Sequence, residues 1–285
     1  MPLKASVFTA FLCIIFGANA VAIKFSLAGL GTFTNLGLRF SIAGVFIFLW
    51  AKYNKKSLKI KKQQILPLLL LSSFFLIQSS LFYMGLSKTS VSHGTLIANL
   101  LPFFVLVLAH YFIPGDNITL KKGLGVTIGF LGIVVLFFEA DQVSGDFMIG
   151  DLIILLAVFF WALNAIYAKK IILNFSSLQI TFYPMVFAIP SFFILACFFD
   201  TQMIKTIDTT ILGALFYQSF IATTFGFVAW NILLRKFGTT SLFSFVFLLP
   251  LAGVFFGVLL LDEPLTHHIL ISITLIVSGI IIVNK

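Results

Sequence analysis

Apolar segments follow one another along nearly the whole chain, and each is close to the length that a helix needs to cross a membrane. About 20 residues of helix span the ~30 Å hydrocarbon core of a bilayer. Ten such segments can be delimited, joined by short connections: 5–24, 33–51, 66–86, 90–112, 123–139, 150–169, 180–199, 210–234, 241–261 and 267–284. We therefore predict an all-α integral membrane protein with ten transmembrane helices.

Composition agrees with this prediction and excludes a soluble domain. Hydrophobic residues make up 60% of the chain and charged residues 9%, whereas soluble domains contain about 25% charged residues. The apolar segments are continuous rather than alternating, which favours helices over a β-barrel, and a helix satisfies its own backbone hydrogen bonds in lipid.

Basic residues predict the orientation in the membrane, because cytoplasmic connections are rich in lysine and arginine. A cytoplasmic N-terminus collects most of the 18 basic residues on the inner side, namely Lys4, Lys52, Lys55, Lys56, Lys59, Lys61, Lys62, Lys121, Lys122, Lys169, Lys170, Arg235, Lys236 and Lys285. Both termini are then cytoplasmic. Most acidic residues fall on or near the outer side.

The net charge of +9 does not indicate a nucleic-acid partner. The cations lie on one face of a membrane protein, where topology and anionic lipid account for them. We predict no nucleic-acid binding. The run YNKKSLKIKK at 53–62 is expected to be a solvated loop, with a lipid-headgroup or partner contact as the alternative.

One sequence motif with polar residues occurs twice in the chain. FGANAVAIK at 16–24 returns as WALNAIYAK at 161–169, with asparagine, alanine and lysine in the same places. NLLP at 99–102 answers FLLP at 247–250, and a third pair, GIVVL and GIIIV, ends each half; the three offsets are 145, 148 and 147 residues. Offsets that differ by so few residues are typical of a duplicated unit.

The duplication predicts two five-helix repeats, at 1–142 and 143–285. Because five is odd, the second copy enters the membrane from the opposite side. The two copies then form an inverted repeat, which is the arrangement that gives many transporters matching inner and outer gates.

These residues resemble the ten-helix members of the drug/metabolite transporter superfamily, which have two EamA-type domains. The strongest marks are FGANAVAIK, LGLRFSIAG at 36–44, the prolines of the fourth and ninth spans, and LLLDEPLTHH at 259–268. The first half departs from the family pattern, because PGDNIT at 114–119 lacks the glutamate that is common before the fifth helix.

The resemblance implies export or exchange of small metabolites, often amino acids, through a cavity between the halves. The best prediction is an amino acid or a related compound moved across a bacterial inner membrane by alternating access. A channel-like facilitator, or a carrier of a nucleotide-derived cofactor or a drug, remains the alternative.

Polar groups inside membrane spans are costly and tend to face a cavity. On this ground we predict that several of them contact substrate, with hydrogen bonding between helices as the alternative for each one. They are Asn19, Gln78, Tyr83, Asn99, Asn164, Tyr167, Gln218, Thr223, Thr224 and Asn231. Trp161 and Trp230 lie near the two later asparagines, and we expect them to border the same cavity and to stack on a planar substrate.

Pro102 and Pro250 occupy matching depths in the fourth and ninth spans. Each removes a helical hydrogen bond and permits a hinge or gate. Paired interruptions of this kind point to a transport site.

Charged residues near the outer side form a further group. Lys24 and Arg39 are expected either to pair with Glu263 or to bind a substrate carboxylate or phosphate. Glu263 and Thr266 have the composition of a helix start at the last span. His93 near the outer start of the fourth span is read as a packed histidine that is able to titrate.

No acidic residue lies near the middle of a predicted span, which disfavours a strongly proton-driven pump and favours facilitated export or exchange. No catalytic or metal-binding motif is present, so we predict no enzyme activity, no metal and no cofactor. The expected partners are a small-molecule substrate and membrane lipid, and the expected state is a monomer or a weak homodimer.

Overall fold

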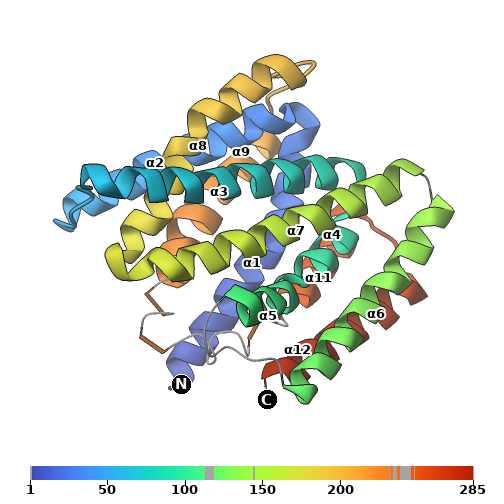
Figure 1. Cartoon of the computed structure of the whole chain (residues 1–285). Coiled ribbons are helices and arrows are strands. Elements are labelled where there is room, and N and C mark those ends of the chain that lie inside the picture. The colour runs from blue at the N-terminus through green and yellow to red at the C-terminus, as the bar shows by residue number, and fades with distance from the viewer. Residues whose placement is uncertain are drawn as a thin grey trace.

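The computed structural model describes residues 2–112, 119–143, 145–230, 232–233, 236–237, 245–246 and 248–284. Helices account for nearly all of them, and the described residues contain no strand beyond one bridge between Leu30 and Ile204. Figure 1 shows long helices packed along one another.

The first part of the chain forms six helices: α1 (Leu3–Gly29), α2 (Thr32–Tyr53), α3 (Lys62–Lys88), α4 (Val91–Ala98), α5 (Leu101–Phe112) and α6 (Leu120–Val143). The rest forms α7 (Gly145–Ile171), the 3-10 turn η1 (Ile172–Asn174), α8 (Ser177–Phe199), α9 (Thr209–Phe216), the π-helix η2 (Tyr217–Gly226), α11 (Leu248–Leu261) and α12 (His267–Asn284).

Among the described residues, seven helical segments are long and apolar enough to cross a membrane. They are Leu3–Gly29, Thr32–Tyr53, Lys62–Lys88, Val91–Phe112, Gly145–Ile171, Leu178–Phe199 and Thr209–Trp230. Two further apolar helices, Leu248–Leu261 and His267–Ile282, are shorter. The prediction of an all-helical, multi-pass membrane protein is confirmed, whereas the count of ten spans stays a prediction.

The fourth predicted span, 90–112, is interrupted and not one regular helix. α4 ends at Ala98, Asn99 has ψ near 2°, and α5 begins at Leu101. The break lies next to Pro102, which has no N–H to donate to the preceding turn and disfavours helical geometry in the residue before it. Pro250 likewise stands in the first turn of its helix, α11.

The eighth predicted span, 210–234, contains a feature that the sequence did not predict. Between Tyr217 and Gly226 the chain is a π-helix. The hydroxyls of Thr223 and Thr224 there donate to the carbonyls of Gln218 and Ser219, five residues earlier. Segments of π-helix occur frequently at functional sites.

Contacts between helices pair distant parts of the chain. α6 lies along α12, α3 along α7, and α2 along α8, while α1 packs against α9, η2 and α11 (Figure 1). Glycines permit close helix crossings, since a Cβ on Gly85 of α3 would lie 2.8 Å from the carbonyl oxygen of Gly150 in α7.

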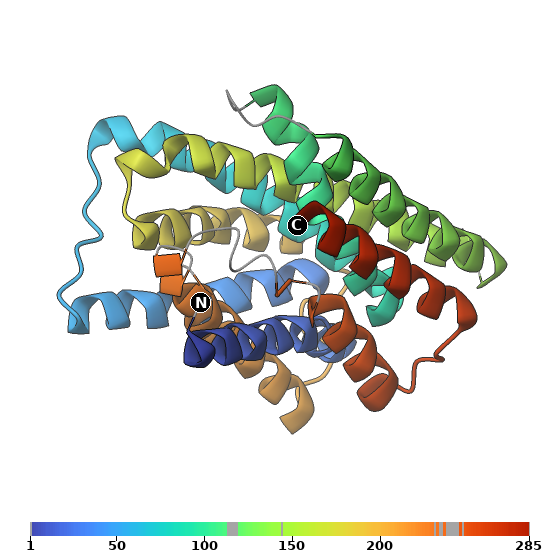
Figure 2. The ribbon, with the colours of Figure 1, turned by 90° about the horizontal axis from the view of Figure 1, so that it is seen from below.

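The two ends of the bundle differ in charge. The acidic end carries Asp146, Asp200, Asp208 and Glu263, where α1 meets the start of α2 and α11 meets α12. The lysine-rich end carries the connection 54–61 and the link from α7 to α8. In Figure 2 the lysine-rich connection lies on the left and the α11–α12 connection on the right. α1 begins at the lysine-rich end, whereas α12 begins at the acidic end.

Candidate functional site

A central cavity of about 480 Å³ lies among the helices. Its volume is in the range of small-molecule sites. It reaches from Arg39 and Tyr83, within two turns of the helix ends at the acidic end, to Ile180 and Thr181 in the first turns of α8 at the lysine-rich end. The lining comes from both parts of the chain.

Most of the predicted site residues meet in this cavity. Its lining includes Asn19, Arg39, Gln78, Tyr83, Asn99, Pro102, Trp161, Asn164 and Trp230. Trp161 and Trp230 therefore border one cavity, as expected, although contact with substrate stays a prediction for every residue in this set.

Other predicted residues lie elsewhere. Tyr167 is outside the cavity lining and packs its ring 6.0 Å from that of Phe74. Gln218 lies one hydrogen bond behind the lining, as described below. Pro250 lies near the cavity lining without contributing to it. Asn231 lies outside the described residues.

Arg39 lies in the part of the cavity that is closest to the acidic end of the bundle. Its guanidinium is held by neutral side chains. Its Nε donates to Thr223 Oγ1 at 3.0 Å and its Nη1 to Tyr83 OH at 2.7 Å. Tyr83 OH donates in turn to Gln218 Oε1 at 2.6 Å, and Gln218 Nε2 donates to Ser26 Oγ at 2.7 Å. This chain of hydrogen bonds links α2, α3, η2 and α1, so it fixes the guanidinium in the wall.

Three amide side chains in the lining have a buried oxygen with no hydrogen-bond donor among the described residues. They are the Oδ1 of Asn19, the Oε1 of Gln78 and the Oδ1 of Asn99. Buried polar groups are normally paired, so three such oxygens in one cavity point to a ligand.

The repeated asparagines differ in their contacts. Asn164 Nδ2 donates to the carbonyl of Leu71 in α3 at 3.0 Å, a contact between helices. Asn19 leaves its oxygen unpaired at the cavity. Asn164 therefore makes the hydrogen bond between helices that was the alternative to substrate contact, although its side chain also lines the cavity.

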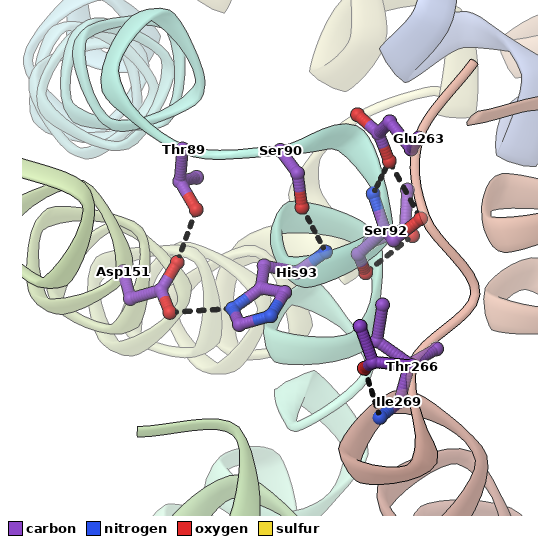
Figure 3. A network of polar contacts seen from close by, with 9 residues as sticks. Thr89, Ser90, Ser92, His93, Asp151, Glu263, Thr266 and Ile269 are labelled. Atoms are coloured by element: carbon purple, nitrogen blue, oxygen red, sulfur yellow. Dashed lines mark hydrogen bonds and ion pairs between the residues drawn. The ribbon is translucent and has the colours of Figure 1, made fainter. Parts of the chain in front are cut away.

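Glu263, in the connection between α11 and α12, binds the start of a different helix, α4. Its carboxylate accepts hydrogen bonds from the backbone N–H groups of Val91 and Ser92, at 2.6 and 2.8 Å, and from Ser92 Oγ at 2.6 Å (Figure 3). These N–H groups begin α4 and have no partner within the helix. Glu263 precedes the last helix as expected from the sequence, but its carboxylate is bound by the start of α4, whereas Thr266 accepts from Ile269 N at the start of α12.

Asp200, at the end of α8, likewise accepts hydrogen bonds from the start of another helix, α2. It accepts from the backbone N–H of Thr34 at 2.8 Å, from the Thr34 hydroxyl at 2.8 Å and from Phe33 N at 3.2 Å. The residue before α2 is Gly31, where a Cβ would lie 2.3 Å from the Asp200 carboxylate. Glycine leaves room for a carboxylate supplied by another helix.

Asp151 and His93 form a fully buried pair. His93 Nδ1 lies 2.7 Å from one Asp151 oxygen, with side-chain exposures of 2% and 0%, and Thr89 donates to the other oxygen at 2.5 Å (Figure 3). His93 is thus a packed histidine, as expected. Asp151, Asp200 and Glu263, which we call the acidic latch, each bind a segment in residues 33–93.

Lys24 and Arg39 do not form the expected ion pair with Glu263. Lys24 Nζ instead donates to the carbonyls of Leu86 and Thr89, at 2.8 and 2.6 Å. It lines a separate cavity of about 560 Å³ at the acidic end, with Asp200 and Lys205. The carbonyls at the end of α3 are nearer partners than the carboxylate, which is occupied by α4.

Sequence reasoning missed Asp151 and Asp200 as parts of these networks, whereas Thr223 was expected among the polar residues of its span and accepts from Arg39. Asp151 stands at the start of an apolar span, where an acidic residue is equally typical of an exposed helix start. No group of three metal-binding side chains occurs in the part of the chain that the structure describes.

Comparison with known proteins gives a consistent result. A model of the EamA-like transporter family matches residues 3–138 and again 148–285. A "Probable amino-acid metabolite efflux pump" of Escherichia coli (strain K12) is 26% identical, over 99% of this chain and 95% of that protein. An "Uncharacterized transporter" of Archaeoglobus fulgidus is 25% identical, over 94% of each chain. A solved structure described as "Crystal structure of protein" has a TM-score of 0.72 at 15% identity, covers 98% of this chain and 96% of its own, and shows the fold alone.

Proposed function

Since the chain belongs to the EamA-like transporter family, we propose that it moves an amino acid or a related small metabolite across a bacterial inner membrane by alternating access. It is a membrane transporter and not an enzyme. The efflux-pump names of its relatives support this substrate class and the direction of export.

The observation that carries the proposal is the asymmetry of the central cavity. At one end the acidic latch joins α4, α2 and α3 to later parts of the chain. At the other end the cavity extends to Thr181, close to the start of α8. A cavity that is sealed on one side and approached on the other is one of the two states that alternating access requires.

The pattern of contacts supports an inverted repeat of two halves, 1–142 and 143–285. An offset of about 145 residues relates α1 to α7, α3 to α9 and η2, and α5 to α11. The contact of α1 with α11 then corresponds to that of α7 with α5, while α2 pairs with α8 and α6 with α12. α1 ends at the acidic end, whereas α7 begins there.

The charge distribution supports a cytoplasmic lysine-rich end, since lysine marks inner connections. In this orientation both termini are cytoplasmic, the acidic latch is an outer gate, and the described state is open towards the cytoplasm, as a substrate awaiting export requires. Release of substrate outside then requires the latch to open while the lysine-rich end closes.

Counterflow in proteoliposomes tests the proposal. Vesicles with purified protein are preloaded with pooled amino acids, and then, in separate samples, with nucleotides, cofactors or drugs. Saturable uptake of labelled tracer that depends on the matching internal pool supports a carrier. Flux that neither saturates nor responds to the internal pool would identify a channel, and absence of flux for all pools would contradict transport of these compounds.

A further inference from the structure

The central cavity contains one charge. Arg39 is the only charged residue among its described lining residues, and only 5% of its surface is exposed. No described carboxylate lies within 4 Å of its guanidinium. A buried charge without a counter-ion is unfavourable, so this position favours an anion brought by the ligand.

The hydrogen bonds of Arg39 leave part of its guanidinium free for such an anion. The group has five N–H donors in a planar fork. Thr223 takes the one at Nε and Tyr83 takes one at Nη1, while Nη2 donates to none of the described residues. The Nη1–Nη2 edge matches a carboxylate, which arginine binds through two parallel hydrogen bonds.

The unpaired amide oxygens supply the opposite polarity. Asn99 Nδ2 donates to the Thr95 carbonyl at 2.7 Å, which fixes the orientation of this amide and leaves its oxygen as the unpaired group. Gln78 and Asn19 contribute one further buried oxygen each. Oxygens of this kind accept hydrogen bonds, and an ammonium group offers three N–H donors.

Most of the remaining wall is aromatic or apolar, with Phe40, Phe75, Phe82, Trp161 and Trp230 among its members, and its other polar side chains are neutral. A single fixed positive charge balances a singly charged carboxylate and leaves a doubly charged phosphate uncompensated. The lining thus combines one cation, several acceptors and an apolar surface.

Resting on the proposed transport function, we propose that the cavity selects a zwitterion with an apolar side chain: Arg39 binds its carboxylate, and the oxygens of Asn19, Gln78 and Asn99 bind its ammonium. Arg39 is then the residue that determines specificity for a carboxylate.

Ligand-induced thermal stabilisation of the purified full chain tests this assignment with three pools. One holds amino acids with apolar side chains, the second holds their carboxamides, and the third holds the corresponding acids without the amine. We expect stabilisation by the first pool, and binding weaker by about 10-fold or more for either of the others. Equal binding of the carboxamides, or no binding of amino acids, would overturn the proposal.

Variants locate the carboxylate site. Arg39→Gln should abolish the advantage of amino acids over their carboxamides, and Arg39→Lys should retain part of it. Lys205→Gln, which removes an exposed cation outside the cavity, should change nothing. An unchanged preference in folded Arg39→Gln would overturn the role of Arg39; the wild-type comparison stands even where that variant does not fold.

Counterflow separates failure of this proposal from failure of transport. Saturable exchange of nucleotides or drugs, without binding of amino acids, would refute the zwitterion site and leave the transporter intact. Absence of exchange with every pool would refute the transport of these compounds. The thermal-stabilisation comparison of amino acids, carboxamides and acids would still test the zwitterion site.

Discussion

The acidic end and the lysine-rich end of the bundle are held together by different chemistry. At the acidic end, three carboxylates bind helix starts and buried side chains at 2.5 to 3.2 Å. At the lysine-rich end, Gln64 donates to the Asn174 carbonyl, Gln179 to the Lys59 carbonyl, and Tyr183 to the Leu58 carbonyl. These are neutral contacts, and two of the three are exposed.

The difference between charged and neutral hydrogen bonds indicates which end of the bundle is harder to open. A hydrogen bond to a charged group contributes about 1.5–3 kcal/mol, against about 0.5–1.5 kcal/mol for a neutral one. Loss of a carboxylate should therefore destabilise the molecule more than loss of a glutamine, and four sets of variants test this ranking.

Asp151→Ala should have the largest effect. It removes the acceptor of the Thr89 hydroxyl and the charged partner of His93 Nδ1, and loss of a partner by a buried polar group costs about 1–3 kcal/mol. We expect a loss of about 3 kcal/mol in the free energy of unfolding, measured in mixed detergent micelles. Asp146→Ala is the matched control, because the Lys88–Asp146 pair is 41% and 78% exposed and should contribute little; equal losses would contradict the ranking.

Glu263→Ala should follow, with a loss of about 2 kcal/mol, since it removes the charged acceptor of two backbone donors. Gly257→Ala tests the same contact without removing charge, because a Cβ there would lie 2.7 Å from Glu263 Oε2 and 3.1 Å from Ser92 Oγ. Both variants should accelerate hydrogen exchange at Val91 and Ser92. Unchanged exchange in both would show that Glu263 does not hold the start of α4.

Asp200→Ala should cost about 1 kcal/mol, which is typical for the loss of a helix cap. Gly31→Asp is the informative partner variant, because a side chain at this position would collide with Asp200. We expect Gly31→Asp to restore part of the lost stability only in the Asp200→Ala background. If Gly31→Asp had the same effect with and without Asp200→Ala, the two side chains would not compete for one position at the start of α2.

Gln64→Ala and Gln179→Ala at the lysine-rich end should have the smallest effect, about 0.5 kcal/mol each: each glutamine also accepts from a backbone N–H at the start of its own helix, but all of these hydrogen bonds are neutral and exposed. The same unfolding measurement applies. A loss as large as that of Glu263→Ala would remove the distinction between the two ends.

The fold class and much of the cavity were predictable from the sequence, because both depend on local chemistry. Continuous apolar segments require helices in lipid, and polar side chains such as Asn19, Gln78 and Asn99 are too costly to face it. Pro102 marked the break between α4 and α5 by the same local rule. These features need no knowledge of which helices are neighbours.

The acidic latch was not predictable, because its partners are distant in sequence. Glu263 binds α4 across 171 residues and Asp200 binds α2 across 166. Asp151 reads as an ordinary helix start until the fold brings His93 to it. Gln218 likewise reads as a cavity residue, yet it is occupied by Tyr83 and Ser26.

Cysteine accessibility from the two sides of the membrane tests the central claim most directly, namely that a sealed acidic end covers a cavity open towards the lysine-rich end. Ser79→Cys in the cavity lining is introduced into a Cys13→Ser, Cys197→Ser background. Lys56→Cys and Lys205→Cys at the exposed ends calibrate an impermeant thiol reagent.

We predict that Ser79→Cys reacts from the side of Lys56 and is protected from the side of Lys205. Adding Asp200→Ala and Glu263→Ala should increase its reaction from the Lys205 side. Fast reaction from the Lys205 side with the acidic latch intact, or no change when it is removed, would contradict the account.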